Sequence, residues 1–136
     1  LTLANMLSTL DHMPCLTIAL AQGAAMGGGL GLLSCCDMAI AQTDTKFALS
    51  EVRLGLIPAT ISPYVLRAIG VRQARRYFQT GERFSAETAC AIGLVHSVCD
   101  DLDAALQSTL STVLQNGPQA MRESKELCRD YAGCCI

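Results

Sequence analysis

The sequence predicts an α/β protein in which short buried strands alternate with helices and which becomes mainly helical toward its C-terminus. Short apolar runs bounded by glycine or proline are typical of core strands, and apolar residues that recur at helical spacing are typical of amphipathic helices. Of the 136 residues, 51% are apolar and 16% are charged, which is the balance of a globular chain with one buried core.

The first part of the chain is predicted to supply most of the strands. Leu3, Leu7 and Leu10 recur at helical spacing until Pro14 stops the helix. A short apolar run follows, as in a core strand, and then a series of glycines. The expected elements are a helix over residues 2–12, strands over 16–20, 38–41 and 46–49, and a glycine-rich turn over 23–29 that leads into a helix reaching residue 36.

The character becomes helical after Pro58. Ser62-Pro63 favours a helix start, Gly70 favours a helix end, and Ser85 is a typical N-cap for a further short helix. The expected elements are helices over 62–70, 71–78, 85–93 and 101–115, a strand over 94–98, and a last helix that begins at Gly117-Pro118. We therefore expect a core unit over residues 1–98 and a helical C-terminal region over 99–136.

Charge and cysteine content argue against several kinds of partner. The formal net charge is −2 and no run of lysine or arginine occurs, so no nucleic-acid surface is predicted. The eight cysteines lie mostly inside apolar runs, as small core residues do. No C-x-x-C motif occurs and the chain has two histidines, so we expect no metal site and reduced thiols in an intracellular compartment.

A stretch without charged residues, from His12 to Cys36, is long enough to raise the question of a membrane helix. It contains Pro14, Gln22 and three consecutive glycines, which would make a poor isolated helix. We expect a buried strand, a turn and a buried helix here rather than a membrane span.

The glycine triplet Gly27-Gly28-Gly29 is predicted to lie where a strand region passes into a helix. Without Cβ atoms the backbone can approach a ligand closely, and the first amides of a helix have no internal acceptor, so they can hold an anion or a developing oxyanion. The alternative is that the glycines only allow close packing of strand and helix. No G-x-G-x-x-G and no Gly-Lys-Ser/Thr motif occurs, so dinucleotide and P-loop sites are unsupported.

The triplet is the first of five linked motifs that follow one another along nearly the whole chain. The motifs are Gly23-Ala24-Ala25-Met26-Gly27-Gly28-Gly29-Leu30-Gly31-Leu32 with Cys36-Asp37-Met38-Ala39-Ile40-Ala41, then Phe47-Ala48-Leu49-Ser50-Glu51-Val52, Leu54-Gly55-Leu56-Ile57-Pro58, Gly81-Glu82-Arg83-Phe84-Ser85-Ala86 and Ala91-Ile92-Gly93-Leu94-Val95. In order and spacing this series resembles the enoyl-CoA hydratase/isomerase (crotonase) family, in its C-terminal half.

The resemblance implies a crotonase-like ββα spiral, here partial, followed by a C-terminal helical region of the trimerisation type. It also implies acyl-CoA thioester substrates, no cofactor beyond the coenzyme A of the substrate, and trimers or dimers of trimers. Gly28 is implied to give one amide of an oxyanion hole, and Glu51 to be a catalytic glutamate acting on water or on a carbon-bound proton. The alternative for Glu51 is a surface carboxylate before a turn. The implied substrate-binding residues are Met26, Gly27, Gly28, Gly31, Pro58 and Ala59.

The chain departs from the family pattern at Gly31, where ordinary enoyl-CoA hydratases carry a second catalytic glutamate. An isomerase that moves a proton between two carbons needs one base only, so a Δ3–Δ2 enoyl-CoA isomerase is an alternative to a hydratase. The motifs Ser50-Glu51-Val52, Gly55-Leu56-Ile57-Pro58-Ala59 and Ile61-Ser62-Pro63-Tyr64 look most like bacterial methylglutaconyl-CoA and isohexenylglutaconyl-CoA hydratases. That likeness implies a glutaconyl-type substrate, leucine or isoprenoid catabolism and the bacterial cytoplasm.

The resemblance also implies that an N-terminal half supplies the second oxyanion amide and most of the coenzyme A contacts. Residues 1–136 alone are therefore expected to be incomplete and without turnover. A further alternative is a catalytically inactive crotonase fragment that folds by packing on partner subunits.

Overall fold

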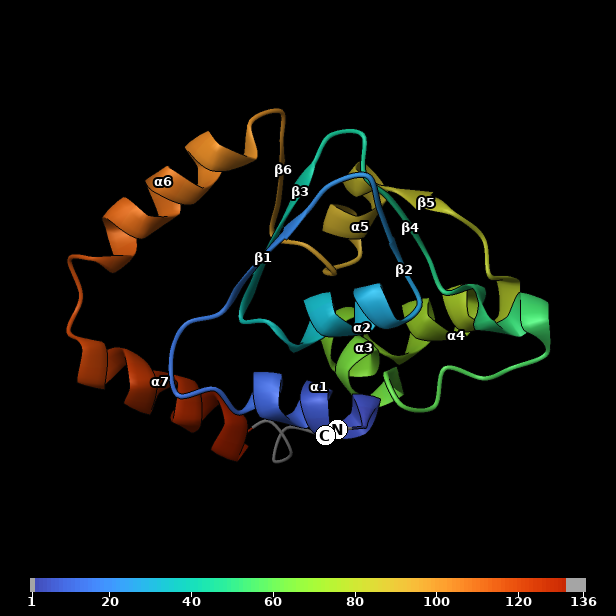
Figure 1. Ribbon diagram of the computed structural model, residues 1–136, viewed down its shortest axis with the longest axis horizontal. Coiled ribbons are helices and arrows are strands. Elements are labelled where there is room, and N and C mark those ends of the chain that lie inside the picture. The colour runs from blue at the N-terminus through green and yellow to red at the C-terminus, as the bar shows by residue number, and fades with distance from the viewer. Residues whose placement is uncertain (1, 132–136) are drawn as a thin grey trace.

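A computed structural model describes residues 2–131, and its strands fall into two sheets of three strands each (Figure 1). One sheet has the order β1-β3-β6 and is parallel; the other has the order β2-β4-β5, with β4 and β5 antiparallel. The strands are β1 Ile18–Ala21, β2 Ala24–Met26, β3 Met38–Gln42, β4 Lys46–Ala48, β5 Phe84–Ser85 and β6 Ser97–Cys99.

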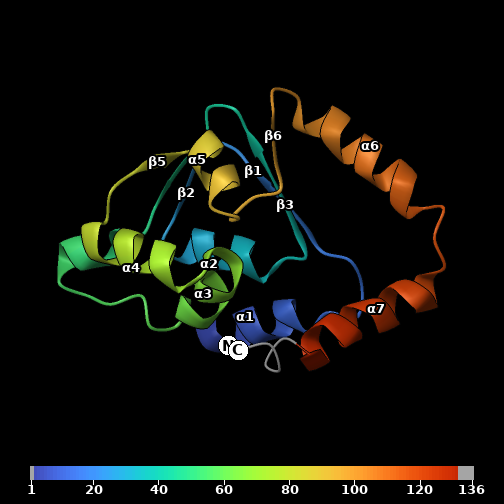
Figure 2. The same cartoon turned by 180° about the vertical axis from the view of Figure 1, so that it is seen from behind.

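The helices divide into a layer beside the sheets and an arm at one side. Helices α1 to α4 form the layer, α5 lies among the strands, and α6 and α7 run along one side of the molecule, where α7 reaches α1 (Figures 1 and 2). Over residues 2–131 none of them is long and apolar enough to span a membrane. The helices are α1 Leu3–Asp11, α2 Gly28–Cys35, the 3-10 helix η1 Ser50–Leu54, α3 Ser62–Ile69, α4 Val71–Thr80, α5 Ala86–Ala91, α6 Leu102–Val113 and α7 Pro118–Tyr131.

The order of the elements is a ββα repeat. Strand β1 belongs to the first sheet, β2 to the second, and α2 follows; β3 then returns to the first sheet, β4 to the second, and helices follow again. Each strand pairs in parallel with its equivalent from the other repeat, Ile18 with Met38 in the first sheet and Ala24 with Lys46 in the second. The spiral confirms the predicted fold class.

The core lies between the helix layer and the sheets. Phe47 of β4 is fully buried and stacks on Phe84 of β5, with ring centroids 5.6 Å apart, and Tyr77 of α4 closes on Phe84 at 4.5 Å. These aromatic contacts join the second sheet to α4. Leu30 of α2 and Val65 of α3 are also fully buried, so the two helices meet through apolar side chains.

The predicted helix boundaries are largely confirmed by their caps. The Ser85 hydroxyl accepts a hydrogen bond from the amide of Thr88 at 3.1 Å, and Gly70 and Gly81 have positive φ at the ends of α3 and α4. In the same way Asp101 caps α6, since its carboxylate accepts from the amide of Ala104 at 3.1 Å. Serine and glycine thus act locally, as the sequence indicated, and the structure adds the Asp101 cap.

Two expectations about strands were wrong. Residues 24–26, predicted as part of a turn, form β2, because their partner β4 lies far along the chain and no local pattern reports the pairing. The strand expected over 94–98 is Ser97–Cys99 instead. Leu94 is buried and its amide donates to the carbonyl of Ala89 at 2.8 Å, so it extends the C-terminal turn of α5. Strand β5 was not expected.

Helix α7 is attached to the body by polar contacts. Lys125, whose side chain is 13% exposed, binds the Asp37 carboxylate at 2.9 Å and the Cys15 carbonyl at 2.9 Å. Arg122 donates to the Pro14 carbonyl at 3.2 Å. The same Asp37 oxygen accepts from the amide of Thr17 at 2.9 Å, so one carboxylate joins α7 to the start of both parallel strands.

We predict that Lys125→Met loosens α7 without unfolding the sheets. Removing one member of a largely buried ion pair leaves Asp37 poorly compensated, and the local opening free energy of α7 should fall by about 1–2 kcal/mol. Amide hydrogen exchange in α7 should then speed up by roughly 5- to 30-fold, while β1 and β3 keep their protection. Lys46→Met, at the exposed lysine of β4, is the control. Unchanged exchange in α7 would show that the ion pair does not hold the helix.

Candidate active site

The register of β2 and β4 brings Gly28 and Glu51 together. Met26 pairs with Ala48, and the amide of Gly27 continues the ladder with a hydrogen bond to the Ala48 carbonyl at 3.1 Å. The segments that follow these two strands leave the sheet side by side, the one after β2 into α2 and the one after β4 into η1. Because parallel strands end at the same edge, the helix start at Gly28 faces the 3-10 turn that carries Glu51.

Gly27 makes this close approach possible. Its φ is +49°, in the region that favours glycine, and a Cβ at this position would lie 2.9 Å from Oε1 of Glu51. Any side chain would therefore displace the carboxylate as well as strain the backbone. The Gly27 amide is used by the sheet, so this residue shapes the site and does not donate to it.

A small hollow of about 160 Å³ opens at this edge. It brings together four of the predicted site residues, and it adds four that were not predicted as site residues. The predicted residues are Gly28, Glu51, Pro58 and Ala59; the added ones are Leu3, Ile57, Thr60 and Ile61. Leu3 comes from α1, far from the others in sequence, and only the packing of α1 could reveal it.

Glu51 is the polar group of this hollow. In the described part of the chain its Oε2 is the one buried side-chain nitrogen or oxygen that has no hydrogen-bond partner. Such a group costs about 1–3 kcal/mol, and more when it is charged, so native structures keep it where it has a function. The residue itself is half-buried and lines the hollow, so its carboxylate lies at the wall of this space with Oε2 covered.

Gly28 contributes a backbone amide and free space. It is the first residue of α2, where an amide has no acceptor within the helix. A Cβ at Gly28 would meet no other atom within 4 Å, so the space in front of it is open. The amide of Gly31, by contrast, is bonded to the Gly27 carbonyl at 3.0 Å. Gly28 is thus the triplet residue that lines the hollow with an uncommitted donor.

Gly31 does not line the hollow, because there is no room for a side chain at position 31. A Cβ there would lie 2.3 Å from Cγ2 and 2.8 Å from Cβ of Ile61, closer than atoms pack. Ile61 is 3% exposed. The departure from the two-glutamate pattern therefore has a steric cause. Met26 lies on β2, beside the hollow and not in its wall.

The walls of the hollow are held by hydrogen bonds to main-chain carbonyls. The amide of Ser62 donates to the Pro58 carbonyl at 3.0 Å and its hydroxyl donates to the Ala59 carbonyl at 2.9 Å, which closes the turn before α3. On the other side, Nε of Arg53 donates to the Gly81 carbonyl at 3.1 Å and ties η1 to the end of α4. The site is therefore built on a fixed frame.

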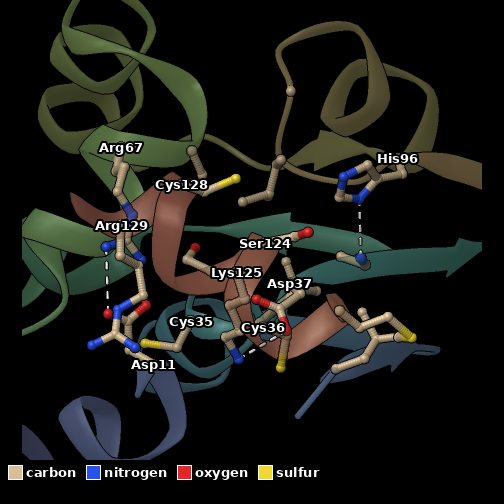
Figure 3. Close-up of a pocket in the computed structure, with 18 residues that line it drawn as sticks. Asp11, Cys35, Cys36, Asp37, Arg67, His96, Ser124, Lys125, Cys128 and Arg129 are labelled. Carbon is tan, nitrogen blue, oxygen red and sulfur yellow. Dashed lines mark hydrogen bonds and ion pairs between the residues drawn. The ribbon is translucent and has the colours of Figure 1, made fainter. Parts of the chain in front are cut away.

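A second, larger hollow of about 580 Å³ lies between α7 and the body and contains none of the predicted site residues (Figure 3). Its charged groups are mostly paired, Arg67 with Asp11 through two hydrogen bonds and Lys125 with Asp37. Burial, with a smaller contribution from Asp11, raises the pKa of the Cys35 thiol to about 12, so this thiol is unreactive near neutral pH. Across residues 2–131 no three potential ligands are grouped as a metal site.

The spiral of strand pairs and helices, with a buried carboxylate beside a glycine-rich helix start, defines a crotonase-type fold. Residues 1–131 match the family described as enoyl-CoA hydratase/isomerase, and the chain belongs to that family of enzymes.

The chain is similar to several proteins and solved structures of this kind. It is 37% identical over 132 residues to the enoyl-CoA hydratase ACTT6 of Alternaria alternata, which covers 95% of this chain and 44% of that protein. A crystal structure of an enoyl-CoA hydratase from Shewanella pealeana superposes with a TM-score of 0.95 at 51% identity, covering 98% of this chain and 51% of that one. The structure of Pseudomonas aeruginosa AtuE superposes with a TM-score of 0.89 at 40% identity, covering 92% of this chain and 50% of that one. The chain spans about half the length of these relatives.

We predict that Gly31→Ala destabilises the protein, although alanine is more favourable than glycine in an unobstructed helix. The new Cβ would overlap Ile61, and overpacking of this kind costs about 1–3 kcal/mol in the free energy of unfolding. The cost should persist in an Ile61→Val background, which keeps Cβ and Cγ2, and should shrink in Ile61→Ala, which lacks Cγ2.

Chemical denaturation of the four single variants and two double variants measures this coupling. Gly29→Ala is the control, since a Cβ at Gly29 meets no atom within 4 Å. An equal cost of Gly31→Ala in all three backgrounds would contradict the steric explanation.

Proposed function

We propose that the protein adds water across an α,β-unsaturated acyl-CoA thioester, with Glu51 as the proton-transferring group and the Gly28 amide as one donor to the thioester oxygen. The observation that carries this proposal is the unpartnered, buried Oε2 of Glu51, a residue that lines the same hollow as Gly28 at the start of α2. A carboxylate without an internal partner is available to a substrate or its water, and a free amide at a helix start stabilises negative charge.

In hydration, Glu51 takes a proton from water while the water oxygen bonds to the β-carbon. Electrons from the double bond move toward the thioester oxygen, where the Gly28 amide stabilises the enolate-like charge. The α-carbon is then protonated and the carbonyl reforms. Because Glu51 is the one carboxylate that lines the hollow, it can return the same proton. The net reaction adds one water molecule, which leaves a hydroxyl group on the β-carbon and a hydrogen on the α-carbon.

A second candidate is a Δ3–Δ2 enoyl-CoA isomerase, and it is favoured by the steric exclusion of a second carboxylate at position 31. Glu51 would take a proton from C2, the charge would again be held on the thioester oxygen, and the proton would be delivered to C4. One base suffices, since no water is consumed. Both reactions use the same two groups, and product analysis separates them.

The substrate that we propose is a glutaconyl-type CoA ester from leucine or isoprenoid catabolism, with coenzyme A as part of the substrate and no further cofactor. This finer assignment is supported by the motifs around Glu51, Pro58 and Ile61. We place the reaction in the bacterial cytoplasm on the same basis. A catalytically inactive fragment is the alternative that lack of any turnover would favour.

We further propose that the whole protein is a homotrimer or a hexamer. Several large apolar side chains are exposed, among them Leu54 at 77%, Ile57 at 79% and Leu114 at 81%. Leu54 is the last residue of η1, Ile57 lines the hollow, and Leu114 lies just after α6. Exposed apolar side chains of this size are typical of surfaces that a partner covers.

We predict that Glu51→Gln lowers kcat by at least about 100-fold in a form of the protein that turns over an enoyl-CoA, with little change in binding of the ester. The amide keeps the shape of the carboxylate but cannot take a proton. Assays should cover this chain and any longer form that its gene encodes. Glu126→Gln, at an exposed position of α7, is the control. Near-normal turnover by Glu51→Gln would remove this residue from the mechanism.

We predict that Gly28→Val abolishes turnover while the protein still folds, whereas Gly29→Val retains most of it. Neither position has another atom of the chain within 4 Å of a built Cβ, so both variants fit the fold. Only Gly28 lines the hollow, so only its side chain would occupy the place of the thioester. Melting temperature and kcat/KM of the pair test this, and full activity of a folded Gly28→Val would mean that the glycines serve packing alone.

A further inference from the structure

Ile61 holds an unusual position in the hollow. Its side chain lies where a side chain at position 31 would have to go, since a Cβ on Gly31 would come within 2.3 Å of its Cγ2. The same side chain lines the hollow that contains Glu51 and Gly28. Ile61 therefore has two roles. It fills the space that a side chain at position 31 would need, and it forms part of the wall of the hollow.

The backbone fixes this side chain in place. Ile61 is the residue before α3, and its carbonyl accepts hydrogen bonds from the amides of Tyr64 and Val65, each at 3.1 Å. The turn that precedes it is closed by the bond from the Ser62 amide to the Pro58 carbonyl. With 3% of Ile61 exposed, the side chain cannot swing away without opening the core.

The wall around Glu51 is apolar on this side. Apart from Glu51, Gly28 and Thr60, the lining residues have apolar side chains, and none of the lining residues is a lysine, arginine or histidine. A second carboxylate placed against this wall, whether from the protein or from the substrate, would face Glu51 without a counterion. Two like charges that face each other without a counterion repel each other.

We propose that Ile61 is the specificity-determining residue of this hollow: it replaces a second catalytic carboxylate by an apolar wall and selects an apolar group on the acyl chain beside Glu51. This inference rests on the proposed function. With a glutaconyl-type ester, the alkyl branch contacts Ile61 and the distal carboxylate points away from it. Ile61 thereby decides which face of the acyl chain meets the base.

The test compares variants of Ile61 with a series of 2-enoyl-CoA esters that differ in the size of an alkyl branch at C3. Ile61→Ala should raise kcat/KM for the bulkiest branch relative to the unbranched ester by about 10-fold or more, and Ile61→Val by less, since a methylene in an apolar pocket changes discrimination by roughly 10- to 200-fold. Ile61→Val is the milder change if Ile61→Ala folds poorly.

A second comparison separates shape from polarity. Thr is isosteric with Val, so Ile61→Thr set against Ile61→Val should lower kcat/KM for alkyl-branched esters by several-fold with no change in size. Val71→Ala, at an exposed position at the start of α4, is the control for unspecific effects.

The outcomes distinguish the two proposals. An active wild-type protein whose substrate ratios do not move in folded Ile61→Ala, Ile61→Val and Ile61→Thr would overturn the role of Ile61 and leave the proposed function standing. A wild-type protein that turns over none of the esters, either as this chain or in any longer form that its gene encodes, would refute the proposed function, and the role of Ile61 would fall with it.

Discussion

The pairing of β2 with β4 is the constraint on which the site depends. Three residue pairs and the hydrogen bond from the Gly27 amide to the Ala48 carbonyl set the register in which the segments after β2 and β4 leave the sheet. A shift of one residue would turn Gly28 and Glu51 to different faces, because side chains alternate along a strand. Phe47 of β4 also stacks on Phe84 of β5, which Tyr77 of α4 contacts in turn, so the packing of the core holds the register that the chemistry needs.

The same edge of the sheet combines an energetic cost with structural rigidity. Leaving Oε2 of Glu51 buried and unpartnered lowers stability, and the frame of hydrogen bonds around η1 and the turn before α3 opposes any relaxation that would satisfy it. A more mobile loop would let the carboxylate reach solvent. The rest of the molecule therefore keeps the group ready for a ligand, which is how preorganised sites differ from surface carboxylates.

Local chemistry was predictable from the sequence, and long-range geometry was not. Ser85, Gly70 and Gly81 mark helix ends because capping depends on neighbouring residues alone. Strand β2 was missed because its pairing partner lies some twenty residues away and its own residues are small. Gly28 and Glu51 were found through the motifs, and the structure places them together. Leu3 and Ile61 could not be found, since only the packing of α1 and α3 brings them to the hollow.

The fit between Gly31 and Ile61 constrains the order in which this site can change during evolution. A mutation that introduces glutamate at position 31 meets the side chain of Ile61 and destabilises the fold before any second carboxylate can act. A smaller residue at position 61 has to come first, at the cost of a cavity. The two positions are therefore coupled: in this fold a glutamate at position 31 and an isoleucine at position 61 exclude each other.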